Sequence, residues 1–367
     1  MKVLVLGTGI VGHGIAEVLS KKYEVTVADK NERNLINVSN ELKVDHLKVD
    51  VENDDLKKIF EGFDLISGAL PGKYGLKVLE SAAKAGVNIV DNSFMPEDFY
   101  ILDKEFNKAG VLGIPDCGVA PGLSNIIVGY AASRYEYLEG AYIKVGGLPE
   151  RNIPPLGYKV VFSPIDTLDE YTRKVQIVKD WVVEEVDPGD GLEYFFVNSI
   201  GSMEAFYTNG LRSLIRNIRA RNLNEKTIRY RGHMEKIKFL RQIGLLDEEP
   251  IEVDGTNVIP KEVLAILMKK YLSFPEINDL LYMEIKIESN TGVEETYTLF
   301  DKGDYHLSAM ARTTGFTNAV VSDIVLKGKI KETGIIAPEI LSKDLGLYDD
   351  IYESLKSLGI EIKKKVD

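Results

Sequence analysis

Short apolar runs alternate with segments of helical periodicity over the first 115 residues. Runs of strand type end at residues 6, 29, 51, 70, 90 and 115, and stretches with apolar positions at helical spacing separate them. Six strands separated by helices are the content of two mononucleotide-binding halves. The pattern therefore predicts an α/β fold that begins with a Rossmann domain, a doubly wound parallel sheet, over residues 1–120.

From residue 141 the pattern changes to segments of antiparallel strand type. Residues 282–288 alternate apolar and polar positions, which is typical of a sheet with one wetted face. Strands are expected at 142–145, 159–162, 174–178, 182–186, 282–288 and 294–300, and helices at 203–217 and 233–243. We expect residues 121–306 to form a substrate-binding and dimerisation α+β domain with a mostly antiparallel sheet. Residues 307–367 are expected to be helical and to return to the first domain.

A glycine-rich turn follows the first strand and opens the first helix. Gly7, Gly9 and Gly12 have G-x-G-x-x-G spacing, and the positions between them are Thr8, Ile10 and Val11. The first glycine allows a tight turn, the second lets the backbone approach a pyrophosphate, and the third lets the helix pack on the strand. Strand, turn, helix, second strand and acid all follow in the required order, so we predict a dinucleotide site.

The acid at the end of the second strand is Asp29. A carboxylate at this position accepts hydrogen bonds from an adenosine ribose and repels a 2′-phosphate, so the sequence favours NAD over NADP. Lys30 and Arg33 lie just beyond it and could still neutralise a phosphate, which leaves NADP as an alternative.

Ligands of such a sheet bind beyond the carboxyl ends of its strands, so each strand end supplies candidate cofactor contacts. Those after the third strand would lie beside the adenine. The small residues after the fourth would let the chain pass close to the nicotinamide, although a simple loop with a proline stop fits them equally well. The candidates are Asp50, Val51, Gly68, Ala69, Leu70, Pro71 and Asn92.

Composition narrows the classes of partner. The chain has 367 residues, 44% apolar content and a net charge of −12, which fits two globular domains and disfavours nucleic acid and anionic membranes. No leader-like start and no apolar run of about 18 residues is present, so we expect a cytoplasmic protein. One cysteine excludes an internal disulfide framework, and four scattered histidines give no ligand spacing, so no metal site is expected.

Several longer motifs make the chain resemble the saccharopine dehydrogenase-like family. The glycine turn at 7–12 is generic, whereas DCGVAPGLSN at 116–125 and KTIRYRGH at 226–233 are more particular. Further similar stretches are SGALPG at 67–72, DNSFM at 91–95, FYTNGLRSL at 206–214 and ARTTGF at 311–316. The resemblance spans nearly the whole chain and is strongest to the branch of the family that oxidises the ε-amine of L-lysine.

The resemblance implies an NAD-dependent oxidoreductase that acts on a CH–NH2 or CH–NH group of a small amino-acid substrate. The first expectation is oxidative deamination of lysine to 2-aminoadipate 6-semialdehyde, which cyclises to piperideine-6-carboxylate, with release of ammonia. A saccharopine dehydrogenase or reductase is the alternative, because the arginines between 212 and 231 could hold its additional carboxylates. A catalytically silent NAD-binding regulator is a further alternative. We also expect a homodimer.

Within the family-like motifs, charged side chains are candidates for holding the substrate. Arg212 and Arg229 could grip its α-carboxylate, or they could lie on a solvated face. Asp169 and Glu170 could hold an ammonium group, but acids that follow Ser-Pro also begin ordinary helices, and we favour that role for one of them. Tyr171, in the same motif, completes the candidate substrate contacts.

The reaction also needs a base close to the nicotinamide. Asp116, at the end of the sixth strand, is the first candidate, and its structural alternative is the N-cap of the helix that begins near residue 123. His233 is the second candidate, and its alternative is a structural histidine with satisfied hydrogen bonds. Cys117 adjoins Asp116, but a buried packing role fits it better than a reactive thiolate.

Overall fold

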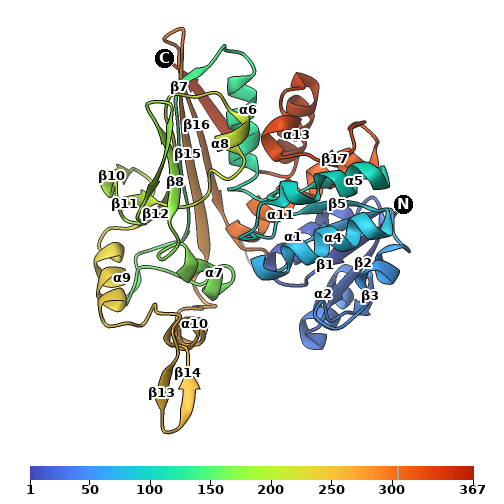
Figure 1. Cartoon of the computed structure of the whole chain (residues 1–367), viewed down its shortest axis with the longest axis horizontal. Helices are drawn as coiled ribbons and strands as arrows, with labels where there is room; N and C mark the ends of the chain where they lie inside the picture. Colours follow the sequence, from blue (N-terminus) through green and yellow to red (C-terminus); the bar gives the residue numbers. More distant parts are fainter. Residues whose placement is uncertain (304–305) are drawn as a thin grey trace. The chain divides into compact units, whose positions relative to one another are not determined.

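The computed structural model describes residues 1–303 and 306–367 (Figure 1). The chain divides into two compact units, each of which joins segments that are distant in sequence. The first domain contains Met1–Arg134 and Ala311–Glu361, and the second contains Tyr135–Met310 and Ile362–Asp367. The limits expected at residues 120 and 306 differ from these, because the helix after the sixth strand belongs to the first domain and the last strand to the second.

A seven-stranded parallel sheet forms the centre of the first domain, in the order β17-β6-β5-β4-β1-β2-β3. Its strands are β1 (Lys2–Leu6), β2 (Glu24–Asp29), β3 (Asp45–Lys48), β4 (Leu65–Gly68), β5 (Asn88–Asp91), β6 (Leu112–Ile114) and β17 (Gly334–Ile335). All six expected strands are present, and they have the order of two mononucleotide-binding halves that meet at β1 and β4. The predicted doubly wound sheet is therefore confirmed, and β17 extends it beside β6.

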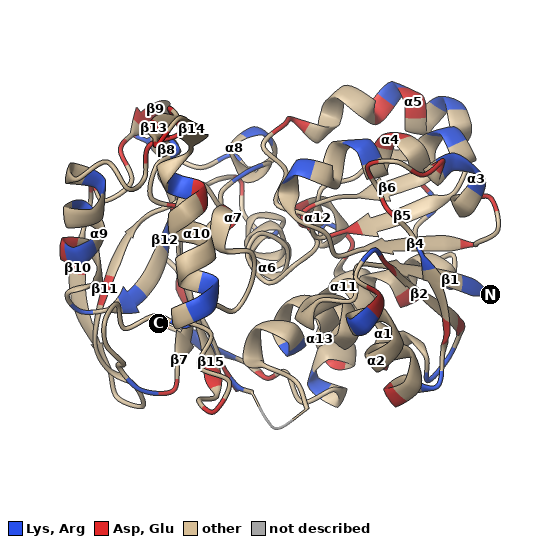
Figure 2. Cartoon of the chain, turned by 90° about the horizontal axis from the view of Figure 1, so that it is seen from below, with Lys and Arg blue, Asp and Glu red and all other residues tan. Residues whose placement is uncertain are grey.

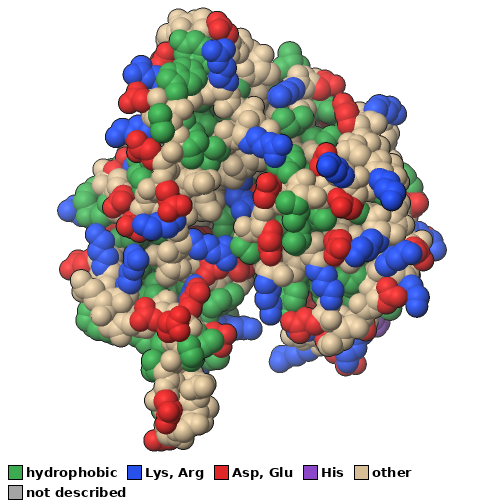
Figure 3. Space-filling model, in the orientation of Figure 1, with side chains coloured by type: hydrophobic (Ala, Val, Ile, Leu, Met, Phe, Trp, Pro, Cys, Tyr) green, Lys and Arg blue, Asp and Glu red, His purple; other side chains and the backbone are tan. Residues whose placement is uncertain are grey.

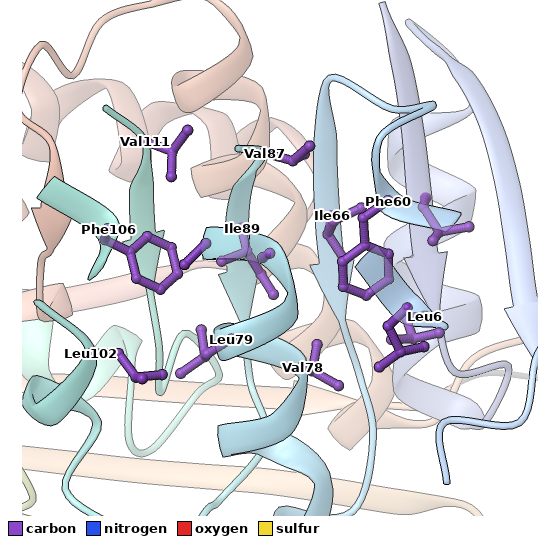
Figure 4. Packing of buried hydrophobic residues seen from close by; sticks show 14 of the residues in the cluster. Leu6, Phe60, Ile66, Val78, Leu79, Val87, Ile89, Leu102, Phe106 and Val111 are labelled. Atoms are coloured by element: carbon purple, nitrogen blue, oxygen red, sulfur yellow. The ribbon is translucent and has the colours of Figure 1, made fainter. Parts of the chain in front are cut away.

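Helices pack on this sheet, and their apolar faces form its core. They are α1 (Ile10–Leu19), α2 (Glu32–Leu42), α3 (Leu56–Phe60), α4 (Gly75–Ala85), α5 (Asp103–Ala109), α6 (Leu123–Ala132), α11 (Ala309–Leu326), α12 (Pro338–Leu341) and α13 (Leu345–Ser357), with short 3-10 turns η1 (Gly72–Tyr74) and η2 (Phe99–Leu102). Phe60 of α3, Leu79 of α4 and Phe106 of α5 are fully buried against Ile66 and Ile89 of the sheet (Figure 4). No helix among the described residues is both long enough and apolar enough to cross a membrane.

A nine-stranded mixed sheet forms the centre of the second domain, with the main order β10-β11-β12-β7-β15-β16-β18. β8 pairs with both β12 and β9. The pair of β7 and β12 is parallel, whereas the other strand pairs of this sheet are antiparallel. The strands are β7 (Leu138–Pro149), β8 (Val175–Lys179), β9 (Val182–Val186), β10 (Glu193–Val197), β11 (Gly201–Tyr207), β12 (Leu223–Tyr230), β15 (Asp279–Ser289), β16 (Glu294–Lys302) and β18 (Ile362–Val366). The expected mostly antiparallel sheet is thus present.

Helices and a small hairpin complete the second domain. They are α7 (Pro164–Asp169), α8 (Leu214–Asn217), α9 (His233–Gln242), α10 (Pro260–Tyr271) and the hairpin of β13 (Ile251–Val253) and β14 (Thr256–Val258). The helix expected at 233–243 is confirmed by α9. Charged residues of both signs occur on the helices of each domain (Figure 2).

Three expected elements of the second part of the chain were wrong. The helix expected at 203–217 is instead β11, a loop and α8. Residues 203–206 are all buried, so β11 lacks the alternation of apolar and polar positions by which a strand is recognised. The strand expected at 159–162 is irregular, because Val160 N–H donates to Leu272 O at the end of α10 rather than to a ladder. Residues 362–366 are β18 and not helix, since Ile362 is buried against β16 and three exposed lysines follow it.

Candidate functional site

The glycine turn between β1 and α1 has the geometry that a phosphate site requires. Gly7 has a φ of 106°, and a Cβ built on it would lie 2.4 Å from Ala69 O. A Cβ on Gly12 would lie 1.9 Å from Gly7 O, so both positions admit only glycine. A Cβ on Gly9, by contrast, has no atom within 4 Å. The outer side of the turn is therefore open, and the first N–H groups of α1 can face an anion there.

Asp29 is held by the turn itself. Its Oδ2 accepts hydrogen bonds from Thr8 N–H (2.7 Å) and Thr8 Oγ–H (2.9 Å), and its Oδ1 accepts one from Asn31 N–H (2.8 Å). Two carboxylate oxygens offer about four acceptor sites, so an acceptor site remains on Oδ1 for a ribose hydroxyl. Thr8 therefore orients the Asp29 carboxylate through these two hydrogen bonds.

The loops after β3 and β4 are joined at the side of the site expected to hold the adenine. Asp50 accepts hydrogen bonds from Glu52 N–H (3.0 Å) and the Asn53 amide (2.9 Å), which lower the pKa of Asp50. Tyr74 O–H, at the end of η1, donates to Glu52 Oε1 (2.5 Å), and Lys30 Nζ lies 6.0 Å from the Tyr74 ring centre. A cation next to Asp29 is therefore oriented toward the same rim.

The chain after β4 packs directly against the glycine turn. Ala69 N–H donates to Leu6 O (2.8 Å), and Leu70 Cδ2 lies 3.2 Å from a Cβ built on Gly7. Residues 68–71 therefore form a wall of the candidate cofactor site beside the glycine turn. Val51, expected beside the adenine, is buried in the core of the sheet, with 6% of its surface exposed.

Asn92, directly after β5, provides a test of whether the residues fit a nicotinamide cofactor. Its N–H donates to Gly68 O (3.2 Å), which holds it beside the end of β4. Its Nδ2 amide is buried and has no hydrogen-bond partner among the residues that the structure describes. Buried amide donors are nearly always paired, and a ligand acceptor such as a carboxamide oxygen would satisfy this one. The residues present therefore fit the cofactor.

At the ends of β5 and β6 the structure brings together two acids, one of them missed by the sequence analysis. Asp116 is 1% exposed, and Asp91 is fully buried, with its carboxylate accepting from Ser93 N–H and Ser93 Oγ–H, both at 3.0 Å. Burial, together with repulsion from Asp116, raises the pKa of Asp91 to about 7. Its position as the last residue of a strand in DNSFM was the signal available in the sequence.

The structural alternative for Asp116 is wrong. The N-cap of α6 is Gly122, whose N–H donates to Asn125 Oδ1 (3.1 Å), and Asp116 lies six residues earlier with a φ of 53°. Cys117 is fully buried, and burial together with the two acids raises the pKa of its thiol well above the ordinary value. The packing role expected for Cys117 is consistent with this environment, because the thiol stays protonated.

In the second domain, Arg229 already has an anionic partner. It is 2% exposed, and its guanidinium donates to Glu170 Oε2 (3.0 Å), to Ile228 O (3.0 Å) and to Tyr171 Oη (3.4 Å). Burial raises the pKa of Glu170, and Arg229 opposes that rise. Glu170, expected as an ammonium ligand or a helix start, is thus the counter-ion of Arg229, and a substrate carboxylate would compete with it.

His233 belongs to the same network. Its Nε2 accepts from Tyr171 O–H (2.9 Å), and its Nδ1 faces Leu156 O (2.9 Å), which assigns the proton to Nδ1. Burial, followed by the charge of Arg229, lowers the pKa of His233 to about 3. Glu204 of β11 accepts from the N–H groups of Gly232 (2.8 Å) and Met234 (2.6 Å) and so anchors the start of α9. A neutral histidine with both nitrogens occupied fits the structural alternative better than a proton carrier.

Asp169 joins two helices. Its carboxylate accepts from Lys261 of α10 and from Arg173, and the N-cap of α7 is Ser163, not an acid. The N-cap role that we favoured for Asp169 or Glu170 is therefore wrong, because both residues lie at the C-terminal end of α7. Lys261 is 2% exposed, so this ion pair is largely removed from water.

Arg212 lies in the loop between β11 and α8, outside the network described for Arg229. Its φ of 50° is a conformation that residues with a side chain rarely adopt, and such strain is common in functional loops. Gly210 of the same loop packs tightly, since a Cβ there would lie 1.6 Å from Glu225 Oε1. Arg212 therefore stays a prediction as a substrate contact.

The first domain contains the predicted cofactor-binding residues, and the second contains the predicted substrate-binding residues. In the first, the cofactor candidates collect at the carboxyl ends of β1 to β5. In the second, Tyr171, Arg229 and His233 form one buried network, with Glu170 as the member whose role was misjudged. The network also includes Tyr158, whose ring lies 5.0 Å from the Arg229 guanidinium and which no motif had indicated.

Comparison with known proteins matches both the N-terminal and the C-terminal part of the chain to one family. Residues 3–114 match the family model "Saccharopine dehydrogenase NADP binding domain", and residues 118–360 match "Saccharopine dehydrogenase C-terminal domain". The chain is 25% identical to the mitochondrial alpha-aminoadipic semialdehyde synthase of Rattus norvegicus over 98% of its own length and 47% of that protein. It thus spans about half the length of this relative.

Other relatives match from end to end. The chain is 24% identical to the saccharopine dehydrogenase (NADP(+), L-glutamate-forming) of Saccharomyces cerevisiae over 99% of its length and 98% of that protein. It is 23% identical to the carboxyaminopropylagmatine dehydrogenase of Synechocystis sp. over 94% and 93% of the two chains. The solved apo saccharopine dehydrogenase of S. cerevisiae has the same fold, with a TM-score of 0.81 at 22% identity over 100% of this chain and 99% of that one. The chain therefore belongs to the saccharopine dehydrogenase family of oxidoreductases, and residues 3–114 are the part that matches the nicotinamide-cofactor-binding domain of that family.

Proposed function

We propose that the chain is an NAD-dependent amino-acid dehydrogenase that oxidises the ε-amine of L-lysine and releases ammonia. The product would be 2-aminoadipate 6-semialdehyde, which closes on its own amine to piperideine-6-carboxylate. The choice of NAD rests on Asp29, whose carboxylate is fixed at the ribose end by Thr8 and Asn31. Its negative charge opposes a 2′-phosphate.

The observation that carries the choice of lysine is that three of the six arginines between residues 212 and 231 are paired with acids of the protein. Arg219 pairs with Glu136 (3.4 Å), Arg221 with Asp180 (2.8 Å) and Arg229 with Glu170 (3.0 Å). Saccharopine carries two more carboxylates than lysine and needs additional cations. Because these three arginines have protein partners, the smaller substrate with a single carboxylate fits better.

The bound nicotinamide would supply the hydride acceptor, and the chain would supply position and proton transfer. The glycine turn and the start of α1 would hold the pyrophosphate, and the Asn92 amide would bond the carboxamide. Asp116 would take the proton of the substrate ammonium, whose reference pKa of ~10.4 keeps it charged at neutral pH. Only the neutral amine can release hydride from its carbon. Water would then add to the resulting imine, and ammonia would leave.

The second candidate function is a saccharopine-type dehydrogenase that uses NADP. It is favoured by the names of the relatives, which act on saccharopine or on carboxylated polyamines, and by the cations Lys30 and Arg33 beside Asp29. A catalytically silent NAD-binding regulator is the third candidate. The buried acids Asp91 and Asp116 count against it, because binding of the cofactor alone has no need of them.

A substrate screen separates the three candidates. The purified chain would be mixed with NAD or NADP and with lysine, saccharopine, ornithine or a carboxylated polyamine, while reduced cofactor and ammonia are both measured. Equal amounts of NADH and ammonia from lysine support the proposal. Reduced cofactor from saccharopine without ammonia establishes the second candidate, and cofactor binding without turnover on any amine establishes the third.

Two further expectations accompany the proposal and stay predictions. A homodimer is expected, and the mass of the protein in solution by light scattering tests it. A cytoplasmic location is expected as well, and fractionation of cells that express the chain tests it. On the face shown in Figure 3, basic and acidic side chains are interspersed with hydrophobic ones, an arrangement compatible with a small-molecule substrate.

A further inference from the structure

Two buried acids lie at the carboxyl ends of adjacent parallel strands of the first domain. Asp91 ends β5 and is fully buried, and Asp116 follows β6 with 1% of its surface exposed. Cys117 N–H donates to Asp91 O (2.8 Å), which holds the chain after β6 against the end of β5. The next residue after Asp91 is Asn92, whose buried amide has no hydrogen-bond partner in the described part of the chain. The pair therefore lies at the end of the sheet that also carries the candidate nicotinamide contact.

The space around Asp91 is fitted to its carboxylate. Its register partner on β4 is Gly68, and a Cβ built on Gly68 would lie 1.9 Å from Asp91 Oδ1. Any larger residue at position 68 would displace the acid. Ser93 supplies two donors to the carboxylate, from its N–H and its Oγ–H. Among the described residues the Asp91 carboxylate accepts its hydrogen bonds from Ser93 and not from a cation, and burial of an acid in such a fitted site is costly for packing alone.

We propose that Asp91 is a positioning residue that makes Asp116 part of a proton-accepting pair, in which the two carboxylates together take one proton from the substrate ammonium. This inference rests on the proposed amine oxidation. In the step, one N–H bond of the ammonium breaks, one O–H bond forms on the pair, and the nitrogen keeps the electron pair. The ammonium becomes neutral while the pair changes from two negative charges to one. Two carboxylates in one buried site bind that proton more tightly than either does alone.

The groups that surround Asp91 give the pair its pH dependence. Asp116 supplies the charge that acts on Asp91, and Cys117, from the same segment, stays a protonated thiol. β4 contributes Gly68, and α11 contributes Asn318, whose amide donates to Val90 O (3.3 Å); neither ionises. Since burial and Asp116 raise the pKa of Asp91 to about 7, the doubly charged pair that can accept a proton increases as the pH rises through 7.

Asp91→Asn tests the pair, because it keeps the size of the side chain and an acceptor for Ser93 while removing one carboxylate. In the parent enzyme kcat/KM for the amine substrate should rise between about pH 6 and pH 8. In the variant this inflection should vanish or move down by more than one pH unit, and kcat/KM at pH 8 should fall at least ~tenfold. The dissociation constant of NADH, measured by fluorescence, should stay within about threefold. The matched control is Asp349→Asn on the exposed face of α13, which should leave every value unchanged.

Infrared titration of the ligand-free protein gives a readout that needs no activity. A carboxyl group of the parent should titrate near pH 7, and this signal should be lost in Asp91→Asn and shifted down in Asp116→Asn. Ser93→Ala, which removes one donor to the ionised acid, should shift the signal up, and it serves if Asp91→Asn does not fold. An active Asp91→Asn enzyme with the parental profile, or a signal near pH 7 that survives in Asp91→Asn, overturns the inference. If the parent oxidises no amine, the proposed function fails, while the titration still decides whether the pair exists.

Discussion

Replacing Asp29 by asparagine should change both the affinity for the cofactor and the choice between NAD and NADP. The Asp29 carboxylate accepts from two donors of Thr8 through Oδ2 and from Asn31 N–H through Oδ1. An asparagine can keep the Thr8 bonds with its single oxygen, but its NH2 group then faces Asn31 N–H. The substitution therefore removes the charge, the Asn31 bond and the acceptor proposed for the ribose.

The size of the effect follows from these losses. A hydrogen bond to a charged group contributes ~1.5–3 kcal/mol and a neutral one ~0.5–1.5 kcal/mol, so NAD should bind about tenfold more weakly. Loss of a unit charge near a 2′-phosphate removes a repulsion of roughly 1–3 kcal/mol at short range with partial solvent screening. Together the two terms shift the ratio of the NADP to the NAD dissociation constant by on the order of a hundredfold in favour of NADP.

Fluorescence titrations with NADH and NADPH measure this ratio directly, with thermal melting as a check on folding. Thr8→Val is the matched control, because it removes one donor to Asp29 and keeps the charge; both affinities should fall together and the ratio should hold. A ratio that stays within threefold in a folded Asp29→Asn protein refutes the assignment. A parent that already prefers NADPH refutes it too, and directs attention to Lys30 and Arg33.

Three more substitutions test the other assignments. Asp116→Asn should bind NADH normally and lose ~10²–10⁴-fold in kcat/KM, and near-parental turnover would exclude it as the base. Glu170→Gln leaves Arg229 without its buried counter-ion, so urea unfolding should show a loss of ~3–5 kcal/mol, whereas an equally stable variant would mean that the pair is solvated. Burial lowers the pKa of His233 to about 3 in the folded protein, so below about pH 6.5 the unfolded chain binds a proton that the folded chain does not. The free energy of unfolding should therefore fall as the pH drops from 6.5 toward 3. His233→Gln should make this dependence on pH less steep, and an unchanged dependence would contradict the network.

The first domain could be predicted because its signals are local. The glycine turn, the helix after it and Asp29 lie within 30 residues, and the steric limit at Gly12 is set by Gly7 O within the same turn. β17 could not be predicted, since it is two residues long and exists through the bonds of Gly334 N–H to Val111 O and Ile336 N–H to Gly113 O. Nothing in its own composition separates it from a loop.

The second domain shows why charged side chains mislead a reading of sequence. Arg229 and Glu170 are 59 residues apart in the chain, and Tyr171 and His233 are 62 apart, yet each pair is in direct contact. From the sequence these groups were candidates for binding substrate, because their mutual neutralisation depends on tertiary contacts. β11 was mistaken for a helix for a related reason: both of its faces are buried.

Buried polar groups need partners, and this requirement separates structural groups from ligand-binding ones in this protein. In the second domain, Arg229, His233 and Lys261 each find protein partners, so their charge and hydrogen-bonding capacity is largely used within the fold. In the first domain, the Asn92 amide has no partner among the described residues, and the outer side of Gly9 is open. The first domain thus carries the groups that still require a ligand.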